Sequence, residues 1–285
     1  MNSIGYRKVI LVACFSAWLW LGAACAKAQS VPIKSLPVYE PCPSLSAGAS
    51  QDDAVAKSIA ALKSQDAKTR IQAAQQLSKA CDKRAVDPLL DVLSGDTEAS
   101  VRIAAAEALG KLGDQESVQP MVDVLGNQTI EVKTAMVSAF ASFPGFKGRN
   151  AVVNQVANPS GADITDEADM RLRCAAILTV CQLKDVSHSR KSILFLSDFL
   201  NSQHPNIRAL AEQTLMELKN TRNGETEMVA IMKQSNNPVL RRWAATWIGK
   251  IGFTGAREAL QEAAATDSDA QVKQNAAESL KKLSQ

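Results

Sequence analysis

Two arginines and two tryptophans lie close together near the C-terminal end of the sequence. The stretch PVLRRWAATWIGKIG, residues 238–252, contains Arg241, Arg242, Trp243 and Trp247, and so half of the four tryptophans of the chain. Indole rings beside guanidinium groups can stack on a ligand or on a nucleic-acid base. The same residues could pack between neighbouring helices, because indoles often bury the ring and leave the N–H at the surface.

The histidines and cysteines do not predict a metal site or a nucleophile. His188 and His204 are the only histidines, and no Cys or His cluster has the spacing of metal ligands. No Gly-x-Ser-x-Gly motif occurs, and neither Cys174 nor Cys181 has a histidine beside it. We therefore expect no metal, no cofactor and no catalytic residue.

Four acidic residues gather in the stretch ANPSGADITDEAD, residues 157–169: Asp163, Asp166, Glu167 and Asp169. Their carboxylates are suitable calcium ligands, but the stretch lacks the Gly and the terminal Glu of an EF-hand loop. We expect a solvated loop that ends in a helix N-cap at Asp166 or Asp169.

The N-terminal residues 1–28 have the layout of a secretory signal peptide. Two basic residues precede an apolar run from about residue 9 to 25, and Ala-Lys-Ala follows as a cleavage site. We expect export to the periplasm or secretion, with no transmembrane segment after cleavage. A lipid anchor at Cys25 is the alternative, which Gly22 disfavours because it occupies a position where Leu is expected.

The chain that cleavage would leave has 29 basic and 29 acidic residues. Nucleic-acid binding needs clustered positive charge that displaces counterions from phosphates. Neither the balance nor any run of residues supplies it, so we expect no nucleic-acid partner.

Four cysteines follow the signal peptide. Cys174 and Cys181 are seven residues apart on one predicted helix, roughly 10 Å along its axis, which exceeds the reach of a disulfide. Cys42 and Cys81 could pair in an oxidising compartment. Their disulfide would tie an irregular, Pro-containing N-terminal arm, residues 29–51, to the first helical hairpin.

A repeat runs through the rest of the chain. Seven related segments follow one another at spacings of 31 to 40 residues, and SVRIAAAEALGKLGD, residues 100–114, is the clearest copy. Alignment brings a basic residue to one position in every copy, and because a planar guanidinium with five donors suits bridges between hairpins, we expect a structural role. This basic ladder consists of Arg70, Arg102, Lys133, Arg173, Arg208, Arg241 and Lys273.

A second amphipathic stretch precedes each copy, as in AVDPLLDVLSGD, residues 85–96. Pro88 and Pro120 fall near the start of two of these stretches, where a first helical turn tolerates Pro. The unit is therefore helix, turn, helix. The Val-Arg-x-Ala-Ala core and the Ala-Leu-Gly-x-Leu-Gly ending resemble HEAT-like repeats, in particular the short class of phycobilisome lyases. The resemblance implies an all-α fold, a right-handed α-α superhelix or solenoid of about seven hairpins over residues 52–285.

One face of the repeated helix varies from copy to copy. The template groups Val101, Ala105, Leu109 and Leu112 on an apolar face. The opposite, variable face should line the concave side of the solenoid, and we call it the groove face. Its candidate partner-binding residues are Thr134, Ser138, Cys174, Leu178, Gln182, Gln213, Arg242, Thr246 and Lys250.

The segment CAAILTVC, residues 174–181, is apolar around its whole predicted helix. We therefore expect other residues to cover this helix on both of its sides. Either the insertion at residues 157–169 or a partner would cover it, so we expect partner binding over the third to fifth repeats. Trp243 aligns with the margin of the buried face and Trp247 lies beside the core, and we expect both to pack between hairpins.

These observations predict an exported, non-catalytic scaffold whose groove binds a protein or peptide partner. The resemblance leaves a chromophore lyase or another HEAT-repeat enzyme as an alternative. A structural or assembly component of the cell envelope is the second alternative.

Overall fold

The second helix of each predicted hairpin is present in the structure. The computed structural model describes residues 33–45, 52–157, 165–183 and 186–284, so the predicted signal peptide, Cys25 and Asp163 lie outside the described residues. The described part contains fourteen α-helices and no strand. The second helices are α3 (Ala67–Ala80), α5 (Ala99–Leu112), α7 (Ile130–Ser142), α9 (Glu167–Gln182), α11 (Pro205–Glu217), α13 (Pro238–Ile251) and α15 (Ala270–Lys282).

A first helix precedes each of these second helices. Pro88 and Pro120 lie in the first turns of α4 and α6, as the sequence predicts. None of the helices in the described part has the length and apolar character that a bilayer span requires. The first helices are α2 (Asp52–Ala61), α4 (Val86–Gly95), α6 (Val118–Leu125), α8 (Phe146–Ala151) with a π-helical extension η4 (Val152–Ala157), α10 (Val186–Phe199), α12 (Gly224–Gln234) and α14 (Arg257–Thr266).

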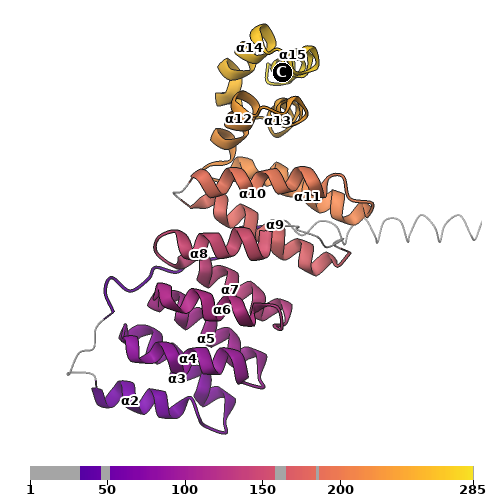
Figure 1. Ribbon diagram of the computed structural model, residues 1–285. Coiled ribbons are helices and arrows are strands. Elements are labelled where there is room, and N and C mark those ends of the chain that lie inside the picture. Colours follow the sequence, from indigo (N-terminus) through magenta and orange to yellow (C-terminus); the bar gives the residue numbers. More distant parts are fainter. Residues whose placement is uncertain (1–32, 46–51, 158–164, 184–185, 285) are drawn as a thin grey trace, which may run out of the picture. The chain divides into compact units, whose positions relative to one another are not determined.

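The hairpins stack in chain order, from α2–α3 to α14–α15 (Figure 1). Each second helix packs against the second helices before and after it, as α5 does against α3 and α7, and α13 against α11 and α15. Residues 34–285 belong to one compact unit. This arrangement is the all-α solenoid that the sequence predicts, and its second helices form a continuous layer.

Local signals set the ends of the second helices. Asp66, Asp166 and Asp269 each cap an N-terminus by accepting a hydrogen bond from a backbone N–H in the first turn. At the other end, Gly113 and Gly252 have φ angles of 72° and 85°, in the left-handed region that ends a helix. These caps fix the turns, and the turns fix how far apart successive hairpins lie.

The core lies between the two layers of helices. The predicted apolar face of α5 is confirmed, since Val101, Ala105, Leu109 and Leu112 are at most 1% exposed. Gly110 is also buried, although it lies on the opposite side of the helix. A Cβ atom at Gly110 would lie 2.7 Å from the Ala139 Cα, so glycine allows α5 and α7 to approach closely.

Candidate functional site

The N-terminal arm lies along the groove face of the second helices. From here on, the name arm means residues 34–45, which contain no helix or strand. The backbone N–H of Leu36 donates to Thr179 Oγ1 on α9, and that of Tyr39 donates to Ser142 Oγ on α7, both at 2.7 Å. Further along, the Cys42 N–H donates to the Lys111 carbonyl of α5 at 2.8 Å. The arm therefore crosses three consecutive second helices as an extended segment.

Tyr39 is the main side-chain contact of the arm. A ring carbon of Tyr39 lies 3.0 Å from the position of a Cβ built at Gly110, and the Lys111 ammonium lies 5.6 Å from the ring centroid. Burial raises the pKa of Tyr39 to about 12, and the nearby Glu107 carboxylate adds to this effect. The Ser138 hydroxyl lies near the phenol and has a smaller, opposite effect on this pKa. The glycine and small serines make room for this ring.

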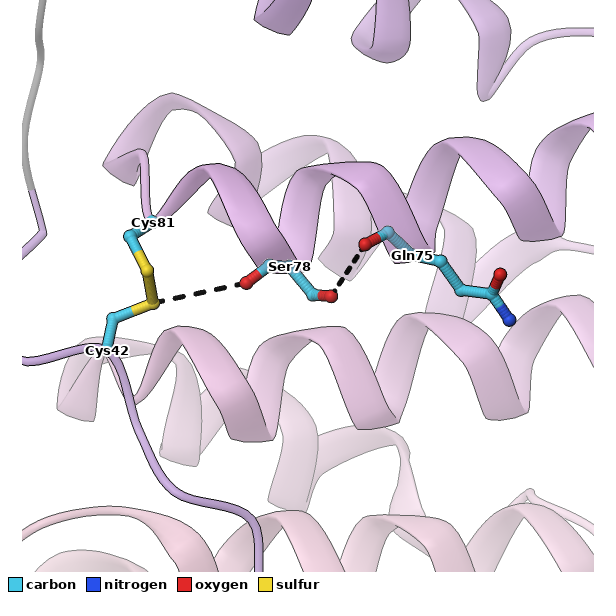
Figure 2. Close-up of a disulfide and its surroundings, with 4 residues drawn as sticks. All are labelled: Cys42, Gln75, Ser78 and Cys81. Atoms are coloured by element: carbon cyan, nitrogen blue, oxygen red, sulfur yellow. Dashed lines mark hydrogen bonds between the residues drawn. A yellow bond between two sulfur atoms is a disulfide. The ribbon is translucent and has the colours of Figure 1, made fainter.

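A disulfide fixes the C-terminal end of the arm. Cys42 and Cys81, the pair considered in the sequence, are bonded with their Cα atoms 5.7 Å apart (Figure 2). Cys81 is the C-cap of α3, with a φ of 51°, and its backbone turns out of the helix there. The Ser78 hydroxyl on the same turn donates to the Gln75 carbonyl at 2.8 Å. The arm is thus tied covalently to the first hairpin.

Three of the predicted partner-binding residues are buried in the structure. Ser138, Cys174 and Leu178 are at most 2% exposed. The arm covers Ser138, and it crosses α9 at the residue that follows Leu178. The Cys174 thiol points to the next second helix, where it donates to the Leu210 carbonyl. The middle of the groove face is therefore closed by the protein itself.

Three other predicted residues of this region are half-buried or engaged in local hydrogen bonds. The Thr134 hydroxyl donates to the Ile130 carbonyl one turn earlier. The Gln182 side chain bonds the loop that follows α11, donating to the Asn220 carbonyl and accepting from the Arg222 N–H. Gln213 is half-buried on α11.

The last three predicted residues lie together at an open recess between α13 and α15. Arg242 and Thr246 line it, and Lys250 lies one turn further along α13 with its ammonium 4.4 Å from the Trp247 ring centroid. The Thr246 hydroxyl accepts a 3.0 Å hydrogen bond from the Asn275 amide. The recess has a volume of about 510 Å³, and its lining is Val239, Arg242, Trp243, Thr246, Trp247, Gln271 and Asn275.

The two tryptophans of this stretch differ in exposure. Trp247 is 7% exposed, in agreement with packing beside the core, whereas Trp243 is only partly buried and borders the recess. The stretch therefore combines the two roles that the sequence left open, since one indole packs and the other lies at an open surface.

A comparison with known families decides what the repeat is. The sequence model of HEAT repeats matches residues 55–141 and 225–285, which is more than half of the chain. The chain belongs to the HEAT-repeat family. The resemblance stated from the sequence is confirmed. No curated protein matches the chain.

Solved structures with a similar fold come from several kinds of HEAT-like protein. The complex of CpcE and CpcF of phycocyanin lyase from Nostoc sp. PCC7120 is 23% identical, covers 85% of this chain and 89% of that chain, and has a TM-score of 0.39. Human deoxyhypusine hydroxylase is 22% identical, covers 81% of this chain and 84% of that chain, and has a TM-score of 0.29. An archaeal HEAT-like repeats protein from Thermococcus onnurineus NA1 is 13% identical, covers 81% of this chain and 97% of that chain, and has a TM-score of 0.38. None of these likenesses identifies an activity or a partner for this chain.

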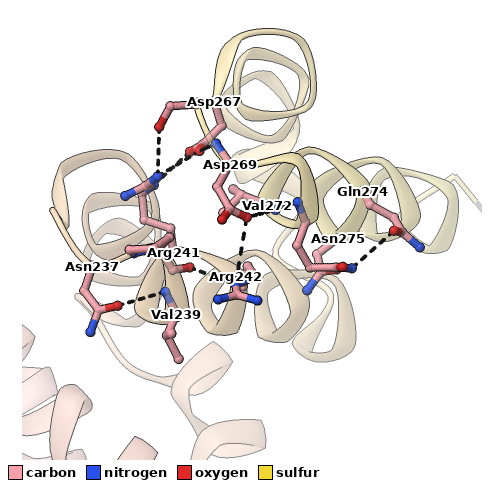
Figure 3. Close-up of polar contacts among 12 residues, drawn as sticks. Asn237, Val239, Arg241, Arg242, Asp267, Asp269, Val272, Gln274 and Asn275 are labelled. Carbon is pink, nitrogen blue, oxygen red and sulfur yellow. Dashed lines mark hydrogen bonds and ion pairs between the residues drawn. The ribbon is translucent and has the colours of Figure 1, made fainter.

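Two arginines of the basic ladder, Arg70 and Arg241, bind the turns between helices. Arg70 forms two hydrogen bonds with Asp96 of the next hairpin, at 2.6 and 2.9 Å, and also donates to the Ser64 carbonyl. Arg241 repeats this pattern, with two bonds of 2.9 Å to Asp267 (Figure 3). It also donates to the Ser235 carbonyl. These arginines bridge successive hairpins.

The remaining members of the ladder make related contacts. Arg102 donates to Gln128 and to the Asp96 carbonyl, and Arg208 donates to the Ser202 carbonyl. Arg173 binds Asp169 at 2.7 Å. Lys133 and Lys273 are half-buried at the corresponding positions.

Neither free thiol is suited to act as a nucleophile. Burial raises the pKa of Cys174 to about 12 and raises that of Cys181 as well. Because the thiolate is the reactive form, both thiols stay protonated and unreactive at neutral pH. His188 is engaged by a 2.8 Å contact between its Nε2 and Asn150 Oδ1. Within the described residues, no group of three His, Cys, Asp or Glu side chains could hold a metal ion.

Two features of the site are missing from the sequence prediction. The first is the path of the arm along the second helices, although the sequence does suggest its tether through Cys42 and Cys81. The second is the indole nitrogen of Trp243, which is buried and has no hydrogen-bond partner in the described part of the chain. Sequence gives no signal for an unsatisfied atom, because that depends on the packing of neighbouring side chains.

Proposed function

We propose that the protein is an exported, non-catalytic HEAT-repeat scaffold that binds a protein or peptide partner along its groove face. The observation that supports this proposal is the arm. It lies on α5, α7 and α9 as an extended polypeptide, and serine and threonine hydroxyls accept hydrogen bonds from its backbone N–H groups. A surface that holds one extended segment in this way is chemically suited to hold another.

The open part of the groove face is the part left for a partner. The arm covers the face over α5, α7 and α9, whereas the recess at α13 and α15 is lined by the exposed Val239 and the partly exposed Arg242. We therefore propose partner binding at the last hairpins, in place of the third to fifth repeats that the sequence suggests. Signal cleavage after residue 28 and delivery to the periplasm or the medium complete the proposal.

Photo-crosslinking in the producing cells tests this function. A photoreactive amino acid is placed at Gln271, which lines the recess, and in a matched control at Glu262, which is exposed on α14. The proposal expects a discrete cross-linked partner from position 271 and none from position 262. Equal cross-linking at both positions, or none at either, would contradict it.

Cell fractionation tests the export part of the proposal. The expected product is found in the periplasm or the medium and starts at Gln29 when its N-terminus is sequenced. A chain that retains residues 1–28 in the cytoplasm would contradict export.

A further inference from the structure

We infer that the recess between α13 and α15 binds an extended segment of the partner that presents a carboxylate beside an apolar side chain. This inference rests on the proposed function and specifies what the partner offers to the recess. Three features of the recess carry it: continuity with the surface that holds the arm, a surplus of hydrogen-bond donors, and an exposed apolar rim.

The recess continues the surface on which the arm lies. In the repeat, Thr246 occupies the position of Ser138, and Lys250 occupies the position of Ser142 and of Lys111. Ser142 accepts a hydrogen bond from the Tyr39 N–H, Ser138 lies near the Tyr39 phenol, and Lys111 lies against its ring. The positions that hold an extended segment on α5 and α7 therefore recur on α13 and remain uncovered there.

The donors at the recess outnumber the acceptors that are available to them. The Trp243 indole N–H is buried without a partner, and such a donor destabilises the protein until it finds an acceptor. Arg242 donates only through Nε, to the Pro238 carbonyl at 3.3 Å, and the nearest carboxylate, Asp269, is 3.9 Å away (Figure 3). Its two terminal nitrogens have no hydrogen bond within the described part of the chain.

The acidic groups near the recess are already engaged. Asp269 accepts hydrogen bonds from the backbone N–H groups of Gln271 and Val272 at the start of α15. Glu278 accepts from the Gln274 amide at 3.0 Å. Neither Arg242 nor Lys250 has a carboxylate within hydrogen-bond distance in the described part of the chain, and a ligand carboxylate is complementary to their donors.

The apolar rim explains why the ligand must be more than a free anion. Val239 is 57% exposed at one end of the recess, and the partly exposed ring of Trp243 lies beside it. A carboxylate carried on a polypeptide next to an apolar side chain would contact the donors and this rim together. The Trp243 N–H would reach such a ligand only if the indole turned about its terminal torsion, which is broad for Trp.

A displayed library of random twelve-residue peptides tests the inference. The bait is the chain from residue 29 onward, which includes the compact unit of residues 34–285. Trp243 and Trp247 are its only tryptophans, because the other two precede residue 29, so indole emission reports on the recess alone. Selected peptides are expected to be enriched in Asp or Glu beside an apolar residue and to change this emission when they bind.

Three variants measured by calorimetry give the decisive comparison. Arg242→Gln removes the charge, and we expect it to weaken binding of the selected peptides about tenfold or more. Trp243→Phe keeps a ring but removes the N–H donor, and should weaken binding severalfold. Lys233→Gln, on the exposed side of α12, is the matched control and should bind like the parent chain. Circular dichroism verifies that each variant is folded.

Each other outcome contradicts the inference in a different way. Selected peptides that are basic, or that bind the Arg242→Gln and Trp243→Phe variants as tightly as the parent, would overturn the carboxylate while the scaffold function stands. Concentration-dependent dimerisation that these two variants abolish would make a second copy the occupant. If no peptide is enriched and position 271 also cross-links to nothing, both proposals fail.

Discussion

Arg241 shows how one side chain links two hairpins. Its guanidinium binds Asp267 through two hydrogen bonds and the Ser235 carbonyl through a third, and the two charged side chains are only 11% and 10% exposed. Substitution by Ala leaves Asp267 without its partner, so we expect a loss of about 2 kcal/mol in the free energy of unfolding. Denaturant unfolding measures it. Lys233→Ala, which breaks the exposed Lys233–Glu262 pair, is the control and should change stability little.

The same pair predicts a dependence on pH. Hydrogen bonds from Arg241 lower the pKa of Asp267 below its ordinary value of 3.8, against the opposing effect of burial. Because the folded pKa is depressed, this stabilisation is present above pH 3.8 and is lost as the pH falls through the folded pKa. The difference in unfolding free energy between the parent and Arg241→Ala should therefore be largest near neutral pH and shrink in acid. A difference that stays constant with pH would contradict this assignment.

Gly110 shows the close approach of two second helices. An added Cβ would overlap Ala139 and touch the Tyr39 ring, so Gly110→Ala should destabilise the protein by about 1–3 kcal/mol. Gly95, at the exposed end of α4, has no atom within 4 Å of such a Cβ. Gly95→Ala is therefore the matched control, and thermal unfolding should show it to be neutral or slightly stabilising. Equal effects of the two substitutions would mean that helix contact does not require Gly110.

At the scale of whole elements, the sequence pattern predicts the helices well and the groove poorly. The segment at residues 100–114 becomes α5 (Ala99–Leu112), because apolar residues recur with the period of a helix and Gly113 marks its C-terminal end. The arm has no such period, so its path cannot be inferred. Ser138, a predicted partner-binding residue, is buried beside this path.

Tyr39 reports whether the arm is docked. It is the only tyrosine after residue 28, so the tyrosinate absorbance of the chain from residue 29 follows this residue alone. Burial raises its pKa to about 12, and we expect the absorbance to titrate there while the disulfide is intact. The folded pKa is raised above 10.0, so the stabilisation is complete below pH 10 and is lost as the pH rises toward 12.

Removing the Cys42–Cys81 disulfide should lower the pH at which Tyr39 titrates. In a Cys42→Ser/Cys81→Ser variant, we expect the midpoint to fall toward 10.0 as the arm leaves the groove more often. Circular dichroism at each pH separates arm release from unfolding of the helices. A midpoint near 10 in the disulfide-bonded chain would show that Tyr39 is not buried against α5.

At the scale of the whole molecule, the arm departs from the usual rule for solenoids. Each repeat normally contacts only its neighbours, so stability is a sum of local terms. Here one segment contacts α5, α7 and α9 and is bonded to the end of α3. The first four hairpins are therefore coupled beyond nearest neighbours, whereas α12 to α15 have no contact with the arm among those described.

Removal of the disulfide should separate these two regions. Loss of a cross-link between residues 39 positions apart costs about 3–4 kcal/mol in the chain-entropy account. In the Cys42→Ser/Cys81→Ser variant, we expect hydrogen exchange to accelerate in α3, α5, α7 and α9 and to stay unchanged in α13 and α15. The reduced parent chain should behave in the same way, because Cys174 and Cys181 are free thiols in both redox states. Faster exchange throughout the chain would mean that all seven hairpins unfold as one unit, and unchanged exchange in α3 to α9 would mean that the tether contributes nothing to their stability.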